Sequence, residues 1–168
     1  SLWPTVIARP GSSTNRLLYI HNLTNALLED LILSNGYTTN QPGAGLYLSR
    51  ADGVTLRRCR VERNVAYLTL DHVTSYGGGI YAKDCQGLLL DGCTVEGNVT
   101  HGDSWHSRGF GGGVFSLNTS GTVVNCVFRT NTAMSLGGNT LYSYSFGGAL
   151  CHQGSGGWSF VQSALVSN

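Results

Sequence analysis

The chain of 168 residues is 41% hydrophobic, has a formal net charge of +1 and contains 24 glycines, so a single domain with a filled core is expected. Charged residues make up 11% of the chain, less than half of the roughly 25% found in an average soluble protein. The only basic cluster is Arg57, Arg58, Arg60 and Arg63. It is too small for the electrostatic footprint of a nucleic-acid-binding protein. No stretch has the roughly 20 mainly apolar residues of a membrane span.

The chain divides into a short N-terminal segment and a series of repeats. Residues 1–15 contain Pro4 and Pro10 and show no repeat, so they are interpreted as a lead-in segment or the tail of a preceding turn. Residues 16–168 repeat a glycine pair, an alternating strand, a polar turn and then apolar-x-x-Cys-x-apolar-x-x-Asn. Because the chain stops on a repeat asparagine without a capping repeat, a fragment of a longer chain is expected.

The asparagines that close the repeats are 29, 34, 33 and 37 residues apart: Asn35, Asn64, Asn98, Asn131 and Asn168. A period in this range is typical of stacked-repeat architectures. Ile80 and Ala82 alternate with Tyr81, which indicates short strands rather than helices. The sequence therefore predicts an all-β fold, a right-handed parallel β-helix (solenoid) of about five turns.

Length variation is concentrated in one segment of each repeat. From each asparagine to the last glycine of the next group the lengths are 10, 15, 15 and 17 residues, whereas the lengths from that glycine to the first apolar position are 11, 11, 10 and 12. An outward-bulging loop is therefore expected after each asparagine. The aromatic residues before three glycine groups, Tyr76, Phe110 and Phe146, are expected to stack along the rod.

The asparagines are expected to form a ladder in tight turns, because asparagine tolerates left-handed conformations and its amide can bond the equivalent amide one turn above. Asn35 is the weakest member, since equal spacing from Leu33 places Gly36 at the ladder position.

The cysteines Cys59, Cys93 and Cys126 occupy the position that Leu31 takes in the first turn, which makes them inward-facing. One residue per stacked rung does not give the tetrahedral convergence of a metal site, so a packed cysteine column without metal is favoured. A disulfide between neighbours such as Cys59 and Cys93 stays open. No cofactor is expected.

Three Asn-x-Ser/Thr sequons begin at Asn22, Asn98 and Asn118. Asn98 belongs to the ladder and is expected to be inaccessible. Asn22 and Asn118 fall in polar turns, where glycans are expected if the source is eukaryotic.

The pairing of these motifs resembles the GGA(I/L/V) and FxxN repeats of the chlamydial polymorphic outer-membrane proteins over roughly residues 43–168. Residues 147–150 (Gly-Gly-Ala-Leu) and 128–131 (Phe-Arg-Thr-Asn) match those motifs in full. The resemblance implies a β-helix exposed at the cell surface that contacts other cells or matrix. Similar β-helix repeats also occur in sugar-cleaving enzymes.

The favoured function is a non-enzymatic extracellular structural or adhesive rod, a segment of a larger cell-surface or filament protein acting through protein or glycan contacts. An outward stripe on the first strand of each turn is its expected binding surface. The stripe consists of Tyr47, Tyr81, Phe115 and Leu150. The alternative is that these side chains only stack between rungs.

The alternative function is a polysaccharide lyase or glycoside hydrolase of the β-helix type. Its candidate catalytic residues lie in the variable loops: Asp71, His72, Asp103, His106 and Arg108. A lyase needs a base and carboxylates that hold Ca²⁺, and a hydrolase needs two or three facing carboxylates. Because only two carboxylates occur in these loops, the non-enzymatic function is favoured.

The 39 residues after Arg129 contain no Asp, Glu, Lys or Arg. Charges are what usually keep exposed strand edges from pairing with other chains. The C-terminal turns are therefore expected to be covered by other parts of the same chain or by a partner subunit.

Overall fold

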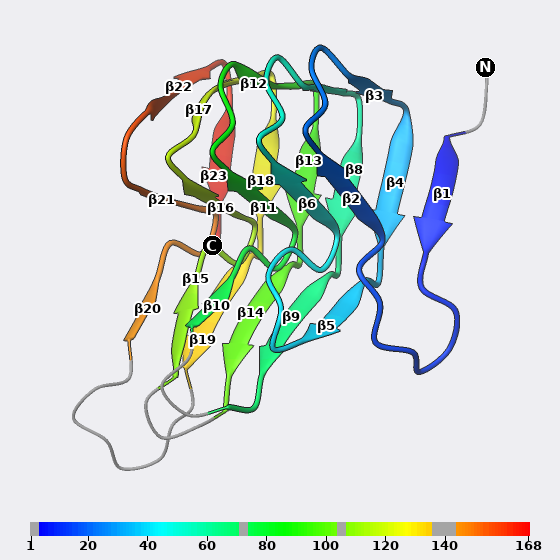
Figure 1. Ribbon diagram of the computed structural model, residues 1–168, viewed down its shortest axis with the longest axis vertical. Coiled ribbons are helices and arrows are strands. Elements are labelled where there is room, and N and C mark those ends of the chain that lie inside the picture. Colours follow the sequence, from blue (N-terminus) through cyan, green and yellow to red (C-terminus); the bar gives the residue numbers. More distant parts are fainter. Residues whose placement is uncertain (1–3, 71–73, 104–106, 136–143) are drawn as a thin grey trace.

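Figure 1 shows the computed structural model of the chain, which describes residues 4–70, 74–103, 107–135 and 144–168. Strands are the only regular elements among these residues, and neighbouring strands run parallel in all five sheets. The chain is an all-β, right-handed parallel β-solenoid, so the predicted fold class is confirmed.

Three sheets form the walls of the β-helix, in the upper part of Figure 1. Sheet A contains β1 (Thr5–Ala8), β4 (Leu31–Ser34), β8 (Arg60–Glu62), β13 (Thr94–Glu96), β18 (Val127–Arg129) and β23 (Ala164–Val166). Sheet B contains β2 (Leu18–His21), β6 (Leu46–Ser49), β11 (Ile80–Lys83), β16 (Val114–Leu117) and β21 (Leu150–Gln153). Sheet C contains β3 (Leu27–Glu29), β7 (Thr55–Arg57), β12 (Leu88–Asp91), β17 (Ser120–Val124) and β22 (Gly157–Val161).

Two further sheets form a lobe on one side, at the bottom of Figure 1. Sheet D contains β5 (Tyr37–Thr39), β9 (Val65–Leu68), β14 (Val99–Gly102) and β19 (Thr132–Ser135), and sheet E contains β10 (Thr74–Tyr76), β15 (Arg108–Phe110) and β20 (Tyr144–Phe146). The segments expected to bulge outward do project from the main helix, as this lobe. They are not plain loops, however, because in each of the three complete turns they carry one strand of sheet D and one of sheet E. Strands that repeat at the same place can pair between turns even outside the main helix.

The lobe is thin because small residues separate its two sheets. The Ser75 hydroxyl donates to the Ala66 carbonyl oxygen at 2.8 Å. A Cβ on Gly109 would lie 2.6 Å from the Met134 carbonyl oxygen, so only glycine fits there.

Three turns carry a full set of five strands: β6 to β10, β11 to β15 and β16 to β20. An incomplete turn, β2 to β5, precedes them, and β21 to β23 follow. The predicted count of about five turns thus includes two incomplete ones.

The core lies inside the walls formed by sheets A, B and C. Leu33, Val61, Val95 and Phe128 stand one above another in sheet A and are at most 1% exposed. Burying a side chain of this kind contributes about 1.5–3 kcal/mol relative to leaving it in water. The predicted inward register of these columns is confirmed.

Left-handed residues mark the corners of each turn. One column lies between sheets C and A and consists of Asp30, Arg58, Gly92, Asn125 and Gln162; another follows sheet A and consists of Asn35, Arg63, Gly97, Thr130 and Ser167. Of the expected ladder asparagines, Asn35 adopts this conformation, whereas the other four do not. In those four turns the residue before the asparagine bends the chain, which leaves the asparagine side chain free to point into the core.

The N-terminal segment covers the sheet A side of the first turn. In the pairing of β1 with β4, Ile7 lies opposite Leu33. Arg9 donates to the Asn35 carbonyl oxygen at 3.0 Å, and its guanidinium lies 5.2 Å from the centre of the Tyr37 ring. The first-turn core side chain Leu33 is therefore only 1% exposed.

Candidate interaction surface

The asparagine ladder follows sheet A at the corner toward sheet D. Asn64, Asn98 and Asn131 are fully buried. The Oδ1 atom of Asn98 accepts two hydrogen bonds from Asn64, one from the backbone N–H at 3.1 Å and one from the side-chain Nδ2 at 3.0 Å. In the next two turns, Asn131 accepts the same pair of hydrogen bonds from Asn98, and Asn168 accepts it from Asn131. Each Nδ2 also donates to the turn below, as from Asn98 to the Val61 carbonyl oxygen at 2.8 Å.

Asn35 is not part of this ladder, contrary to its assignment from the sequence. It is exposed, and its Nδ2 donates to the Ser34 hydroxyl at 2.9 Å. The N–H of Gly36 donates to Asn64 Oδ1 at 2.7 Å. Because the first repeat is one residue short before its asparagine, Asn35 takes the bend and Gly36 takes the ladder position.

The glycine groups pack directly against the ladder. A Cβ on Gly79 would lie 2.9 Å from the Asn98 Cγ atom, and a Cβ on Gly45 would lie 2.8 Å from the Asn64 Nδ2 atom. The two motifs stand 19 residues apart in both turns (45 and 64, 79 and 98). They therefore form one packing unit.

The cysteines form a second ladder at the corner between sheets C and A. The N–H of Cys93 donates to Cys126 Sγ at 3.2 Å, and the N–H of Cys126 donates to Ser163 Oγ at 3.1 Å. All five cysteines are free thiols. Hydrogen bonding with Cys126 and Cys59, together with burial, raises the pKa of Cys93. The column thus supplies hydrogen-bond acceptors, a role that the sequence interpretation missed although Ser163 at the same repeat position pointed to it.

The predicted aromatic stripe is covered. Tyr81 is 6% exposed and Phe115 is 1% exposed, and the Phe115 ring lies 4.4 Å from that of Tyr76 in sheet E. Burial raises the pKa of Tyr81 to about 12. Tyr47 is half-buried, and the Arg16 guanidinium lies 4.7 Å from its ring centre.

Leu150, the fourth residue assigned to the stripe, does not lie in it. It pairs with Val114 in the inward column of sheet B, and Cys151 stands opposite Phe115. The prediction that the stripe is exposed was wrong, because sheet E folds back over sheet B. The aromatic residues before the glycines were the signal for this cover, since Phe110 stacks on Tyr76 at 5.8 Å and on Phe146 at 5.5 Å.

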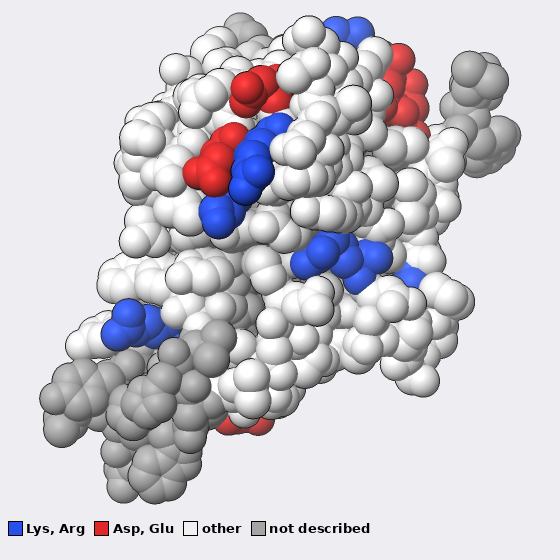
Figure 2. Space-filling model, viewed as in Figure 1, with Lys and Arg blue, Asp and Glu red and all other residues white. Residues whose placement is uncertain are grey.

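The basic cluster near residue 60 is neutralised. Arg58 lies 2.7 Å from Asp30, and Arg57 lies 3.4 Å from Glu29. Glu62 accepts from the remaining two members of the cluster, Arg60 and Arg63. Figure 2 shows that most of the face in view is uncharged, with a few acidic and basic side chains close together in its upper half.

The candidate catalytic residues are only partly placed. Asp71, His72 and His106 lie outside the described residues. Asp103 is exposed and accepts the Tyr67 hydroxyl at 2.7 Å, while the Arg108 guanidinium lies over the Tyr144 ring at 5.9 Å. No metal-binding cluster of His, Cys, Asp and Glu occurs in residues 4–70, 74–103, 107–135 and 144–168.

The two sequon asparagines expected to carry glycans differ in accessibility. Asn22 is exposed, in a left-handed turn with φ of 52°. The Nδ2 of Asn118, where a glycan would attach, donates to Asp84 Oδ1 at 3.0 Å, and its Oδ1 accepts the Ser155 N–H at 3.2 Å. Asn22 is therefore the better placed of the two.

Among the described residues, several side chains of the last turn continue core columns and are exposed. We call this part of the last turn the C-terminal face and define it as Leu150, Phe160, Ser163, Leu165 and Asn168. Phe160 stands above Val123 and Leu165 above Phe128. The lower residues are 0% exposed, and the upper ones are 42% and 57% exposed.

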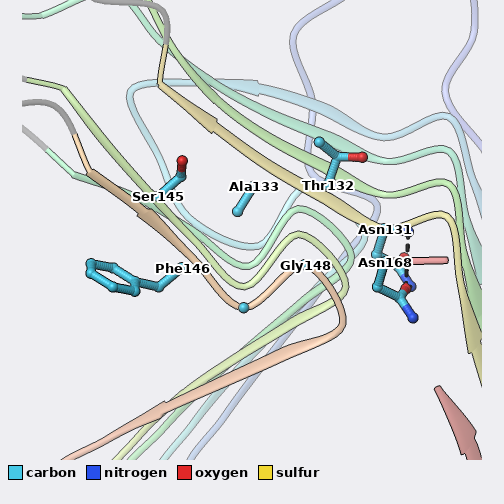
Figure 3. Close-up of a pocket in the computed structure, with 8 residues that line it drawn as sticks. Asn131, Thr132, Ala133, Ser145, Phe146, Gly148 and Asn168 are labelled. Atoms are coloured by element: carbon cyan, nitrogen blue, oxygen red, sulfur yellow. Dashed lines mark hydrogen bonds between the residues drawn. The ribbon is translucent and has the colours of Figure 1, made fainter. Parts of the chain in front are cut away.

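A hollow lies beside this face at the top of the asparagine ladder. It is lined by Asn131, Thr132, Ala133, Ser145, Phe146, Gly147, Gly148 and Asn168. Figure 3 shows the hydrogen bond between Asn131 and Asn168 at one side of the hollow, with the Phe146 ring pointing away from it.

Stacked parallel sheets, corner ladders and a continuous inner core define the class of right-handed parallel β-helix proteins. A family model confirms this class, because the right-handed beta helix region matches residues 12–165. The chain belongs to that family. No curated protein and no solved structure matches it. Within the described residues there is no helix of the length and apolarity needed to cross a membrane.

Proposed function

We propose that this chain is a non-enzymatic, extracellular structural or adhesive β-helix segment of a larger cell-surface or filament protein. It would act through protein or glycan contacts rather than through chemistry. The resemblance of its repeats to those of the chlamydial polymorphic outer-membrane proteins supports a location at the cell surface. The exposed sequon at Asn22 is compatible with an extracellular setting.

The observation that carries the proposal is the continuous stack of parallel strands, whose sides are covered by contacts of the chain itself. On the sides, the basic cluster is paired and the predicted aromatic stripe is packed under sheet E.

The two placed candidates for catalysis do not favour an enzyme. Asp103 is engaged by a tyrosine hydroxyl, and Arg108 stacks on an aromatic ring. Both contacts are ordinary surface interactions.

The test is turnover of polygalacturonate and related polysaccharides, with and without Ca²⁺. We expect no release of new chain ends. Asp103→Ala removes the carboxylate, whereas Tyr67→Phe removes only its hydroxyl partner and serves as the matched control. Cleavage by the parent and by Tyr67→Phe that disappears in Asp103→Ala would overturn the proposal.

A further inference from the structure

Three free thiols stand one above another in consecutive turns, at the corner between sheets C and A. The N–H of Thr94 donates to the Cys59 carbonyl oxygen at 2.9 Å, and the N–H of Val127 donates to the Cys93 carbonyl oxygen at 2.9 Å. These bonds continue the register of sheet A by one residue, so Cys59 lies opposite Cys93 and Cys93 lies opposite Cys126. We propose that this column is a disulfide site, in which oxidation joins Cys93 to one of its two neighbours.

The spacing of the turns allows such a bond. Strands in neighbouring turns lie about 4.7–4.9 Å apart, and a disulfide needs about 4.4–6.8 Å between its Cα atoms. Equivalent Cβ atoms repeat at the strand spacing, which slightly exceeds the roughly 3.5–4.5 Å preferred between the Cβ atoms of a disulfide. The closed bond therefore pulls two corners together and is readily reduced again.

The three sulfur atoms point the same way. Each Sγ atom lies within hydrogen-bond distance of a leucine carbonyl oxygen in the turn below, at 3.3 Å for Cys59, 3.3 Å for Cys93 and 3.4 Å for Cys126. The acceptors stand at equivalent positions of sheet C: Leu28, Leu56 and Leu90. Because the contact repeats, the thiols share one orientation and their sulfur atoms line up along the stack.

Cys93 is the shared member of the two possible pairs. Cys59 and Cys126 stand two turns apart, at about twice the strand spacing, which is too far for a disulfide. A sulfur atom joins only one other in a disulfide. One bond therefore forms in each chain, and one thiol of the column remains.

The other two cysteines serve as internal controls. The register of sheet B places Cys85 between Ala51 and Thr119, and the Cys85 N–H donates to Thr119 Oγ1 at 3.2 Å. Cys151 stands opposite Phe115. Neither has a thiol in register with it among the described residues, so both are expected to stay reduced in the folded chain.

The reaction is exchange with a small-molecule disulfide, for which oxidised glutathione is the probe. The thiolate of an outer cysteine, its proton lost to water, attacks one sulfur of the oxidant. The S–S bond of the oxidant breaks, one glutathione leaves and takes up a proton, and a mixed disulfide remains. The Cys93 thiol then loses its proton and attacks the protein sulfur of the mixed disulfide, which releases the second glutathione. Two protein thiols thus lose two electrons, and the oxidant gains them as two thiols.

The ionisation of the column fits this order of steps. Hydrogen bonding with Cys93 lowers the pKa of Cys59 and of Cys126, whereas hydrogen bonding with these two neighbours raises the pKa of Cys93. The outer thiols are therefore the ones that ionise first, and the thiolate is the nucleophile. All three side chains are 1% exposed, so exchange proceeds through transient opening of the corner.

The test incubates the folded chain with oxidised glutathione, blocks the remaining thiols with iodoacetamide in urea and maps the bonds by mass spectrometry. Three matched variants accompany the parent: Cys59→Ser, Cys93→Ser and Cys126→Ser. Serine keeps a hydrogen-bond acceptor at the corner, since Ser163 at the same repeat position accepts the Cys126 N–H at 3.1 Å. The unfolded parent, oxidised in urea, shows how the cysteines pair without the register of the stack.

We expect one disulfide in each parent chain, always with Cys93, so that the thiols left to block fall from five to three (five minus the two in the bond). Cys59→Ser and Cys126→Ser should each keep one bond, to the neighbour that remains, and Cys93→Ser should lose it.

A folded parent that forms no bond, a bond that contains Cys85 or Cys151, or a bond in Cys93→Ser would overturn the proposal. The same mixture of pairings in native buffer and in urea would also overturn it. Mapping of the parent decides the matter by itself where a serine variant does not fold. The inference goes beyond the proposed function and does not rest on it, because the test supplies the oxidant and involves no polysaccharide.

Discussion

The corner residues explain why asparagine and cysteine recur together in one repeat. Each follows a left-handed residue, as Asn131 follows Thr130 and Cys126 follows Asn125, with φ of 51° and 52°. The backbone N–H of each corner residue donates to the side chain of the corner residue one turn above, not to a backbone carbonyl. Examples are the N–H of Cys93, which donates to Cys126 Sγ, and the N–H of Asn98, which donates to Asn131 Oδ1. Both columns therefore satisfy donors that the bends remove from the sheets.

Two substitutions of one residue, Cys126→Ser and Cys126→Ala, separate the role of its side chain as a hydrogen-bond acceptor from its role in packing. Serine keeps an acceptor for the Cys93 N–H, as Ser163 does one turn above, so the free energy of unfolding should change by less than about 1 kcal/mol. Alanine leaves that N–H buried and unpaired, which should cost about 1–3 kcal/mol. Urea unfolding measures both. Equal losses in the two variants would mean that the thiol acts only by filling space.

At the scale of the element, the glycines set how each turn enters its sheet B strand. Gly111 has φ of 62°, and a Cβ there would overlap the Val114 carbonyl. Gly97 has φ of 60°, but the atom nearest to a Cβ built there would be 3.6 Å away. Gly157 has no positive φ and no neighbour within 4 Å of a Cβ. The three positions thus separate backbone strain from steric overlap.

Gly111→Ala should destabilise by about 2–5 kcal/mol, because strain and a forced backbone shift add. Gly97→Ala should cost about 1–2 kcal/mol for strain alone, and Gly157→Ala should be close to neutral. Thermal unfolding of the three variants gives the order. A Gly111→Ala protein as stable as Gly97→Ala would show that the strand entry tolerates a side chain.

Ion pairs link neighbouring strands on the outer face of sheet A. Glu96 binds Arg129 and lies 3.1 Å from Arg60, and hydrogen bonding from Arg129, with Arg60 adding to it, holds its pKa below the usual range. Because its pKa is lower in the folded state, Glu96 stabilises the fold at pH values above the ordinary glutamate pKa of about 4.3. This stabilisation is lost as the pH falls through the lowered pKa.

Glu96→Gln should therefore lower the melting temperature at pH 7 by about 2–4 °C, which corresponds to roughly 1 kcal/mol in a chain of this size. The difference from the parent should shrink as the pH falls below about 4. Melting curves from pH 7 to pH 3 provide the measurement. A difference that stays constant over this range would contradict a contribution from the ionised carboxylate.

The sequence predicts the stack and its inward columns because in-register strands repeat the same residues, as Val95 and Phe128 show. It does not predict sheets D and E, because their strands lie in segments whose lengths differ between repeats. The wrong prediction that Tyr81 and Phe115 are exposed has the same cause, since sheet E covers them. The position of Asn35 was uncertain for another reason, a single missing residue that shifts the bend onto it.

At the scale of the whole molecule, the two ends of the stack differ. At the first turn, Leu33 lies under Ile7 and is 1% exposed, whereas Leu165, in the same column at the last turn, is 57% exposed. Mutual cover by successive turns is the main source of stability in a stacked-repeat fold. The turns in the middle of the stack, which are covered on both sides, are therefore expected to be the most stable.

Residue-resolved hydrogen exchange of the native chain tests the corner ladders most directly. The backbone amides of Asn64, Asn98 and Asn131, which donate to side-chain carbonyls, should exchange slowly. Ladder amides that exchange as freely as those of an unstructured chain would contradict the account.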